Sequence, residues 1–238
     1  MRSKDYRQSA LASLKGNWFI AVIAGAIAML LGGVEGFSAS FSFNIQLPTS
    51  PDMENGVEQV SRLAAEMPEE LIAILLISYV ISMIIAIAIF IIGCAVAVGY
   101  ARFNLDMVSG AKPKIRTLFA HFDQLGTALC ARLLVFVRIF FGLIFFIVPG
   151  IIAMYQYAMV NQVIADNPGI TAREALRESK RLMKGNKWKY FCLSLSFLGW
   201  SILSALTGGI GYYLLVPYMQ ATFAEFYRSI KIRANFYA

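Results

Sequence analysis

Residues 71–100 read LIAILLISYVISMIIAIAIFIIGCAVAVGY, a run of about 30 mostly apolar residues. A helix of about 20 apolar residues crosses the ~30 Å hydrocarbon core of a bilayer. This run is therefore long enough to cross a membrane, and it must tilt or continue beyond the bilayer as helix. Lipid offers no partner for backbone N–H and C=O groups, and the run shows no strand-like alternation. We therefore predict an α-helix here.

The remainder of the chain has a similar composition. Apolar residues make up 58% and charged residues 15% of the 238 residues, which lies outside the range of soluble domains. We predict an all-α, polytopic membrane protein with a single transmembrane domain over residues 1–238. Pro149 and Gly150 are expected to interrupt the third long apolar run. The six predicted transmembrane helices, arranged as three hairpins, are 18–37, 71–100, 126–148, 150–165, 191–208 and 209–227.

Charge alternates between the segments that flank these spans. Segments 1–17, 101–125, 166–190 and 228–238 carry net charges of +3, +2, +4 and +3, whereas the loop 38–70 carries −5. Six spans place all four basic segments on one side of the membrane and the acidic loop on the other. The positive-inside rule makes the basic side cytoplasmic. We therefore predict that the N and C termini are both cytoplasmic and that the loop 38–70 is outside.

Two boundaries between a basic lead-in and a span resemble one another. Residues 14–18 (LKGNW) precede the first span, and residues 183–188 (MKGNKW) precede the fifth. The likeness reflects either a true repeat of helical hairpins or the residues that an inner membrane boundary favours, namely a basic residue, a helix-ending glycine and a tryptophan. A true repeat requires the first helix, which argues against residues 1–40 being a cleaved signal peptide.

Residues 171–184 have the pattern of an amphipathic helix. Thr171 and Glu174 have the spacing of a capping box, and small or apolar residues recur every three or four positions after them. The pattern predicts either a helix in the headgroup region at the inner face, bound to anionic lipids, or one that packs beneath the spans. The candidate headgroup ligands on its polar face are Arg173, Arg177, Lys180, Arg181 and Lys184.

Two arginines lie inside the third predicted span. Arg138 is about 12 residues into it, so roughly 18 Å deep at 1.5 Å per residue, where a charge costs at least ~2.5 kcal/mol. We expect Arg138 either to pair with a carboxylate or to bind an anionic ligand or a lipid phosphate. Its candidate carboxylate is Glu35, chosen by its predicted depth. Arg132 is shallower and can extend to the inner headgroups. By depth, Glu225 suits Arg132.

Known signatures of catalysis are not found in the sequence. It has no HExxH, GxSxG, P-loop or dinucleotide-binding motif, and its three cysteines fall in apolar runs without CxxC spacing. We predict no catalytic residue, metal site or cofactor. The net charge of +7 is explained by orientation and contact with anionic lipid rather than by nucleic acid. We expect a non-enzymatic module that binds lipid, a hydrophobic peptide or a partner membrane protein; the alternatives are a small transporter or channel and, least favoured, an intramembrane enzyme.

Several short stretches carry a family resemblance. They are 147–152 (IVPGII), 165–168 (ADNP), 175–185 (ALRESKRLMKG), 195–200 (LSFLGW), 206–211 (LTGGIG) and 217–218 (PY), with a weaker likeness over 99–122. They resemble an uncharacterised bacterial family of integral membrane proteins catalogued as domain of unknown function 975. The resemblance implies a multi-pass protein of the bacterial cytoplasmic membrane and implies no activity. The loop 38–70 looks particular to this chain.

Overall fold

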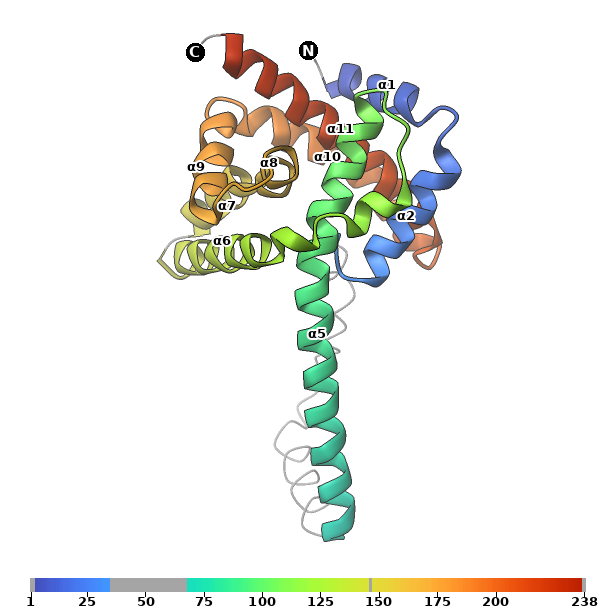
Figure 1. The fold of residues 1–238 in the computed structure, drawn as a ribbon, viewed down its shortest axis with the longest axis vertical. Coiled ribbons are helices and arrows are strands. Elements are labelled where there is room, and N and C mark those ends of the chain that lie inside the picture. The colour runs from blue at the N-terminus through green and yellow to red at the C-terminus, as the bar shows by residue number, and fades with distance from the viewer. Residues whose placement is uncertain (1–2, 35–67, 146, 237–238) are drawn as a thin grey trace, which may run out of the picture.

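The computed structural model describes residues 3–34, 68–145 and 147–236, and all secondary structure within these residues is helical (Figure 1). The prediction of an all-α protein is confirmed. The α-helices are α1 (Ser3–Leu14), α2 (Trp18–Leu30), α5 (Glu69–Val108), α6 (Leu125–Phe145), α7 (Ile147–Tyr157), α8 (Val160–Asp166), α9 (Ala172–Met183), α10 (Lys187–Leu206) and α11 (Ile210–Phe236). Two 3-10 helices, η1 (Ile115–Phe119) and η2 (Phe122–Gln124), join α5 to α6.

Within the described part of the chain, three helical segments are long and apolar enough to cross a membrane. They are Glu70–Val108, Ile115–Ile144 and Lys187–Leu206. Helices α1 and α2 together form a fourth candidate, although the pair is bent by 104°. By length and composition, the protein therefore has three to four candidate membrane-spanning segments among the described residues.

Helix α5 is the longest element and has two different halves. Its 40 residues make it about 60 Å long at 1.5 Å per residue. Residues 70–90 are exposed and extend away from the other described helices, whereas most of residues 93–108 are buried (Figure 1). The helix therefore continues well beyond the predicted span 71–100, and its second half forms part of the protein core.

The predicted fourth span, 150–165, is divided in the structure. Helix α7 ends at Tyr157, and α8 begins at Val160 after a turn at 158–159, which allows α8 to pack against α5. Helix α6 ends at Phe145 and α7 begins at Ile147, so Pro149 and Gly150 lie within the start of α7 and not, as was predicted, between two helices. Pro149 fits the first turn of α7, because an N–H there has no partner within the helix.

The two similar sequence boundaries adopt the same backbone corner. Gly16 and Gly185 have φ values of +92° and +78°, in the left-handed region that favours glycine. The asparagine after each glycine is the N-cap of the next helix, with φ, ψ of −118°, 10° at Asn17 and −109°, −4° at Asn186. The backbone thus repeats at these two corners, as a repeated hairpin requires.

A candidate anion-binding pocket

Helix α9 begins with the predicted capping box. The backbone N–H of Glu174 donates to the hydroxyl of Thr171 (3.4 Å), and the backbone N–H of Thr171 donates to the Glu174 carboxylate (3.0 Å). The hydroxyl of Thr171 also donates to this carboxylate, at 2.7 Å. These hydrogen bonds from the side chain and backbone of Thr171 hold the pKa of Glu174 below its ordinary value. The carboxylate therefore stays ionised at neutral pH and fixes the first turn of α9.

The apolar face of α9 is covered by the protein. Its buried residues are Ala175, Leu176, Ser179, Leu182 and Met183. The hydroxyl of Ser179 donates to the backbone carbonyl of Gln156 at the end of α7 (2.9 Å). Of the two arrangements that the sequence allowed for this face, the structure has the one in which it packs on neighbouring helices. The cationic side chains on the other faces remain exposed.

Three of the cations on α9 face a fourth cation on α6. Arg173, Arg177 and Lys180 are spaced by four and three residues and so share one stripe of the helix. Together with Arg138 of α6 and Tyr157 of α7, they line an open cavity of about 230 Å³, which we call the cationic pocket. Arg138 and the cations of α9, which the sequence placed at different depths, thus meet at one site.

The cationic pocket lacks a negative charge among its lining residues. Arg138 lies over the ring of Tyr157, with 5.5 Å between the guanidinium carbon and the ring centroid, and forms no ion pair with the described residues. Like charges four residues apart, such as Arg173 and Arg177, destabilise a helix by ~0.2–0.5 kcal/mol. A bound anion would relieve this repulsion, and its oxygens would accept hydrogen bonds from the N–H groups of the arginine guanidinium groups.

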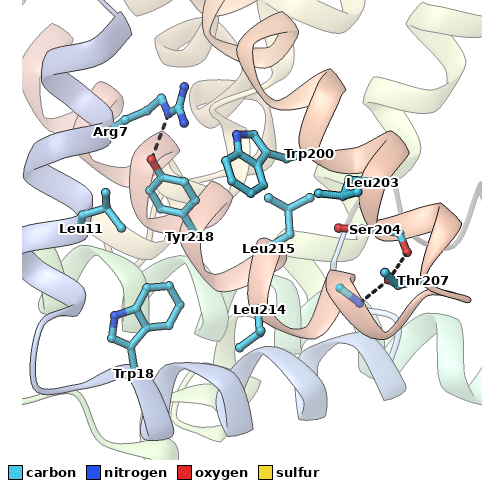
Figure 2. Close-up of a pocket in the computed structure, with 11 residues that line it drawn as sticks. Arg7, Leu11, Trp18, Trp200, Leu203, Ser204, Thr207, Leu214, Leu215 and Tyr218 are labelled. Carbon is cyan, nitrogen blue, oxygen red and sulfur yellow. Dashed lines mark hydrogen bonds between the residues drawn. The ribbon is translucent and has the colours of Figure 1, made fainter.

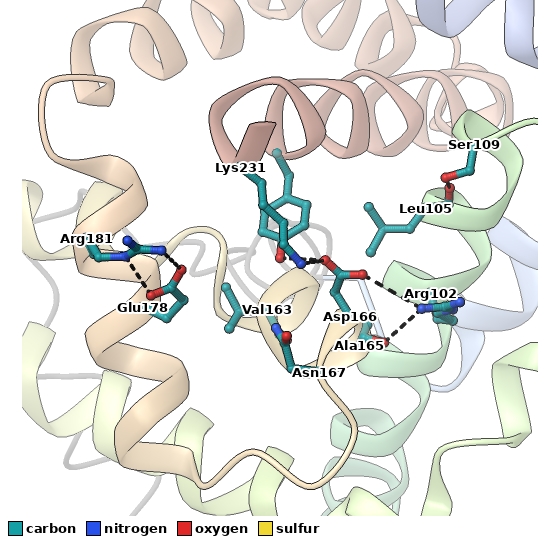
Figure 3. Close-up of polar contacts among 11 residues, drawn as sticks. Arg102, Leu105, Ser109, Val163, Ala165, Asp166, Asn167, Glu178, Arg181 and Lys231 are labelled. Atoms are coloured by element: carbon teal, nitrogen blue, oxygen red, sulfur yellow. Dashed lines mark hydrogen bonds and ion pairs between the residues drawn. The ribbon is translucent and has the colours of Figure 1, made fainter. Parts of the chain in front are cut away.

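The other two predicted cations of α9 lie outside the cationic pocket. Arg181 forms a bidentate ion pair with Glu178, with N···O distances of 2.8 and 2.7 Å (Figure 3). This contact with Glu178 raises the pKa of Arg181 above its ordinary value. Lys184 is exposed at the C-cap of the helix. Neither residue lines the pocket, so each can serve as a control for charge on the same helix.

The remaining predicted residues are not brought into this site. Arg132 lies over the ring of Phe90 (5.2 Å to the centroid) and its Nη1 is 3.8 Å from the sulfur of Cys94. Within the described residues it forms no ion pair with Glu225, which is half-buried on α11. Glu35 lies outside the described residues, so its pairing with Arg138 stays a prediction.

A network around Asp166 fixes the end of α8, and the sequence did not identify it. The Asp166 carboxylate accepts hydrogen bonds from Tyr227 (3.0 Å) and Lys231 of α11 and lies 3.9 Å from Arg102 of α5 (Figure 3). Arg102 also pairs with Asp106 at 3.0 Å. One signal for this network was present, because both aspartates lie within stretches that carry the family resemblance. The network holds α8 against α5 and α11 just before α9 begins.

One known protein family matches almost the whole chain. The family described as "Protein of unknown function (DUF975)" matches residues 1–234. The chain belongs to this family. The match extends to residue 1, beyond the stretches between residues 99 and 218 that carried the resemblance in the sequence. No curated protein and no solved structure matches the chain.

The Asp166 network predicts unequal effects for two charge-removing substitutions. Asp166→Asn should lower the free energy of unfolding by about 1–2 kcal/mol, because it weakens two charge-assisted hydrogen bonds at a partly exposed site. Glu178→Gln should cost about 0.5 kcal/mol or less, because it removes only an exposed pair within one helix. Unfolding of both variants in detergent would measure the difference, and equal losses would contradict a special role for Asp166.

Proposed function

We propose that this protein is a non-enzymatic, multi-pass module of the bacterial cytoplasmic membrane that binds the headgroup of an anionic phospholipid in the cationic pocket. The observation that carries the proposal is the convergence of Arg138, Arg173, Arg177 and Lys180 on one cavity whose lining has no carboxylate. The proposal includes six spans with both termini in the cytoplasm, as the charge alternation along the chain favours.

The exposed apolar side chains support a membrane location. Such side chains cover the first half of α5, α6, the second half of α10 and the start of α11; they include Leu75, Ile84, Phe136, Phe140, Leu203 and Leu214. A monomeric soluble protein rarely exposes contiguous apolar surface on this scale, because its contact with water is unfavourable. In a bilayer the same surface contacts acyl chains.

The surroundings of the cationic pocket favour a lipid over a soluble anion. On α6, Arg138 follows the exposed side chains of Phe136 and Val137 and precedes that of Phe140. A ligand that reaches the pocket from this side would place an acyl chain on the apolar surface and its phosphate among the cations. Arginine suits phosphate because its planar fork of N–H groups can donate two parallel hydrogen bonds.

A second cavity favours the alternative of a small transporter or channel for a polar solute. It has a volume of about 90 Å³ and is lined by Tyr100, Asn161, Gln162 and Gln220 among others. The Tyr100 hydroxyl and the Gln162 side-chain carbonyl are buried without a hydrogen-bond partner in the described part of the chain. Polar groups inside a membrane bundle often mark a solute path. Solute flux into proteoliposomes, lost in Gln162→Leu, would support this alternative over the module.

The proposed topology predicts opposite labelling at two positions. In a background in which Cys94, Cys130 and Cys192 are replaced by serine or alanine, single cysteines at Thr49 and Asn186 should react with a membrane-impermeant maleimide from outside and from inside, respectively. The reason is that Thr49 lies in the acidic loop and Asn186 follows the basic helix. Labelling of both positions from the same side would contradict six spans.

Headgroup binding predicts a selective loss of affinity. Phosphatidylglycerol should bind the purified protein more tightly than phosphatidylcholine does. Arg177→Gln should lower the affinity for phosphatidylglycerol roughly tenfold, since a charge-assisted contact contributes on the order of 1.5 kcal/mol. Native mass spectrometry in detergent would measure both affinities. Lys184→Gln removes an equal charge from the same helix outside the pocket and should change binding less than twofold, roughly.

These affinities distinguish a headgroup site from a diffuse charge effect and from a site for a soluble anion. Equal losses in Arg177→Gln and Lys184→Gln would mean that only the general charge of α9 matters, and would contradict the pocket. Inorganic phosphate at millimolar concentration should compete weakly, because it lacks the acyl chain that contacts α6. If free phosphate binds as tightly as the lipid, the ligand is a soluble anion.

A further inference from the structure

A groove elsewhere on the bundle ends at another cation. It runs between the α1–α2 corner and the α10–α11 hairpin, with a volume of about 410 Å³ (Figure 2). Its apolar walls include Trp18, Trp200, Leu203 and Leu214, all of which are exposed. Arg7 of α1 lies at one end of it. We call this surface the Arg7 groove.

The guanidinium of Arg7 is held in a fixed position by aromatic groups. Its Nε donates to the hydroxyl of Tyr218 (2.9 Å), and its central carbon lies 5.4 and 5.8 Å from the ring centroids of Phe197 and Tyr218. These contacts use one of its five N–H groups and the faces of two rings. Among the described residues no carboxylate lies within 4 Å of it. The two terminal nitrogens are therefore available to an anion.

The length and composition of the groove indicate what else the ligand contains. On α11, the lining residues lie between Gly211 and Tyr218, a stretch of eight residues that rises by about 10 Å along the helix. Leucine and tryptophan side chains line this length, and polar groups are few. A flexible apolar chain fits such a wall, and its anionic end would meet Arg7. A soluble anion would leave the apolar wall without a partner.

We propose that the Arg7 groove binds one anionic phospholipid, with an acyl chain along α10 and α11 and the phosphate on Arg7. This site shares no residue with the cationic pocket and does not rest on the function proposed for that pocket. Charge complementarity favours an anionic lipid over a zwitterionic one. In a zwitterionic lipid the ammonium group of the headgroup already neutralises the phosphate that Arg7 would bind. The two sites would hold two lipids at different places on the same bundle.

The tryptophans of the groove provide a direct readout. The chain has three tryptophans, of which Trp18 and Trp200 line the groove and Trp188 lies outside it. In full-length Trp188→Phe protein, tryptophan fluorescence therefore reports on the groove alone. Phosphatidylglycerol brominated on its acyl chains quenches tryptophan on contact. In detergent micelles it should quench this protein at a roughly tenfold lower concentration than brominated phosphatidylcholine does, if one charge-assisted contact distinguishes them.

Two substitutions of Arg7 test whether its guanidinium binds the phosphate of the lipid. Arg7→Gln should remove the preference for phosphatidylglycerol, whereas Arg7→Lys should keep part of it because the charge remains. Tyr218→Phe retains the ring but removes the hydrogen bond that orients the guanidinium, and it should weaken binding by a smaller factor. Because Tyr218→Phe changes a single hydroxyl, it tests the site even if Arg7→Gln does not fold.

The matched control lies at the other site. Arg177→Gln should leave the quenching unchanged, which separates this inference from the function proposed for the cationic pocket. Equal quenching by both lipids, or quenching that is insensitive to Arg7→Gln, would mean that the groove is ordinary lipid-facing surface and would overturn the proposal. If neither lipid quenches, another occupant such as a helix of a partner protein fills the groove, and the proposal is likewise overturned.

Discussion

Two glycines of α5 allow backbone segments to lie directly against this helix, and the arrangement of the bundle depends on that contact. A Cβ atom at Gly99 would lie 2.1 Å from the carbonyl oxygen of Leu118 in η1, and one at Gly93 would lie 2.7 Å from that of Leu31 after α2. Real side chains do not approach backbone so closely, so a larger residue at either position would displace its neighbour. Helices α8, α11 and α6 also pack on α5, whose second half is therefore the common support.

The cationic pocket follows from this support through a short chain of contacts. Asp166 joins the end of α8 to α5 and α11, and the capping box starts α9 six residues later. The buried face of α9 then fixes its rotation, because Leu176 and Met183 can be covered only if the opposite face points outward. That rotation directs Arg173 and Arg177 toward Arg138. Packing thus brings these cations together, and a bound anion would compensate for their mutual repulsion.

Local signals in the sequence predicted the elements well, whereas contacts between distant segments were not predictable. The capping box of Thr171 and Glu174 and the glycine corner before α10 each depend on a few adjacent residues, and both were predicted correctly. The turn at 158–159 was missed because the predicted span continues through it, whereas the packing of α8 on α5 that follows the turn is a contact between distant segments. Asp166 was missed for a similar reason: its partners lie about 60 residues away in either direction. The cations of α9 were identified, but their meeting with Arg138 required the positions of α6 and α9 in space.

The most direct test of the central claim is the thermal stability of Arg138→Gln with and without added anionic lipid. In lipid-depleted detergent this variant should be as stable as the unaltered protein or more stable, because it removes one of four mutually repelling charges. Phosphatidylglycerol at about 100 times its dissociation constant should stabilise the unaltered protein by about 2.7 kcal/mol and should stabilise the variant far less. The account would be contradicted if Arg138→Gln lowered the stability without lipid by as much as Glu35→Gln does. The double variant would then lose less than the sum of the two single losses. Arg138 would then serve an ion pair, and the account of the pocket as an anion site would be wrong.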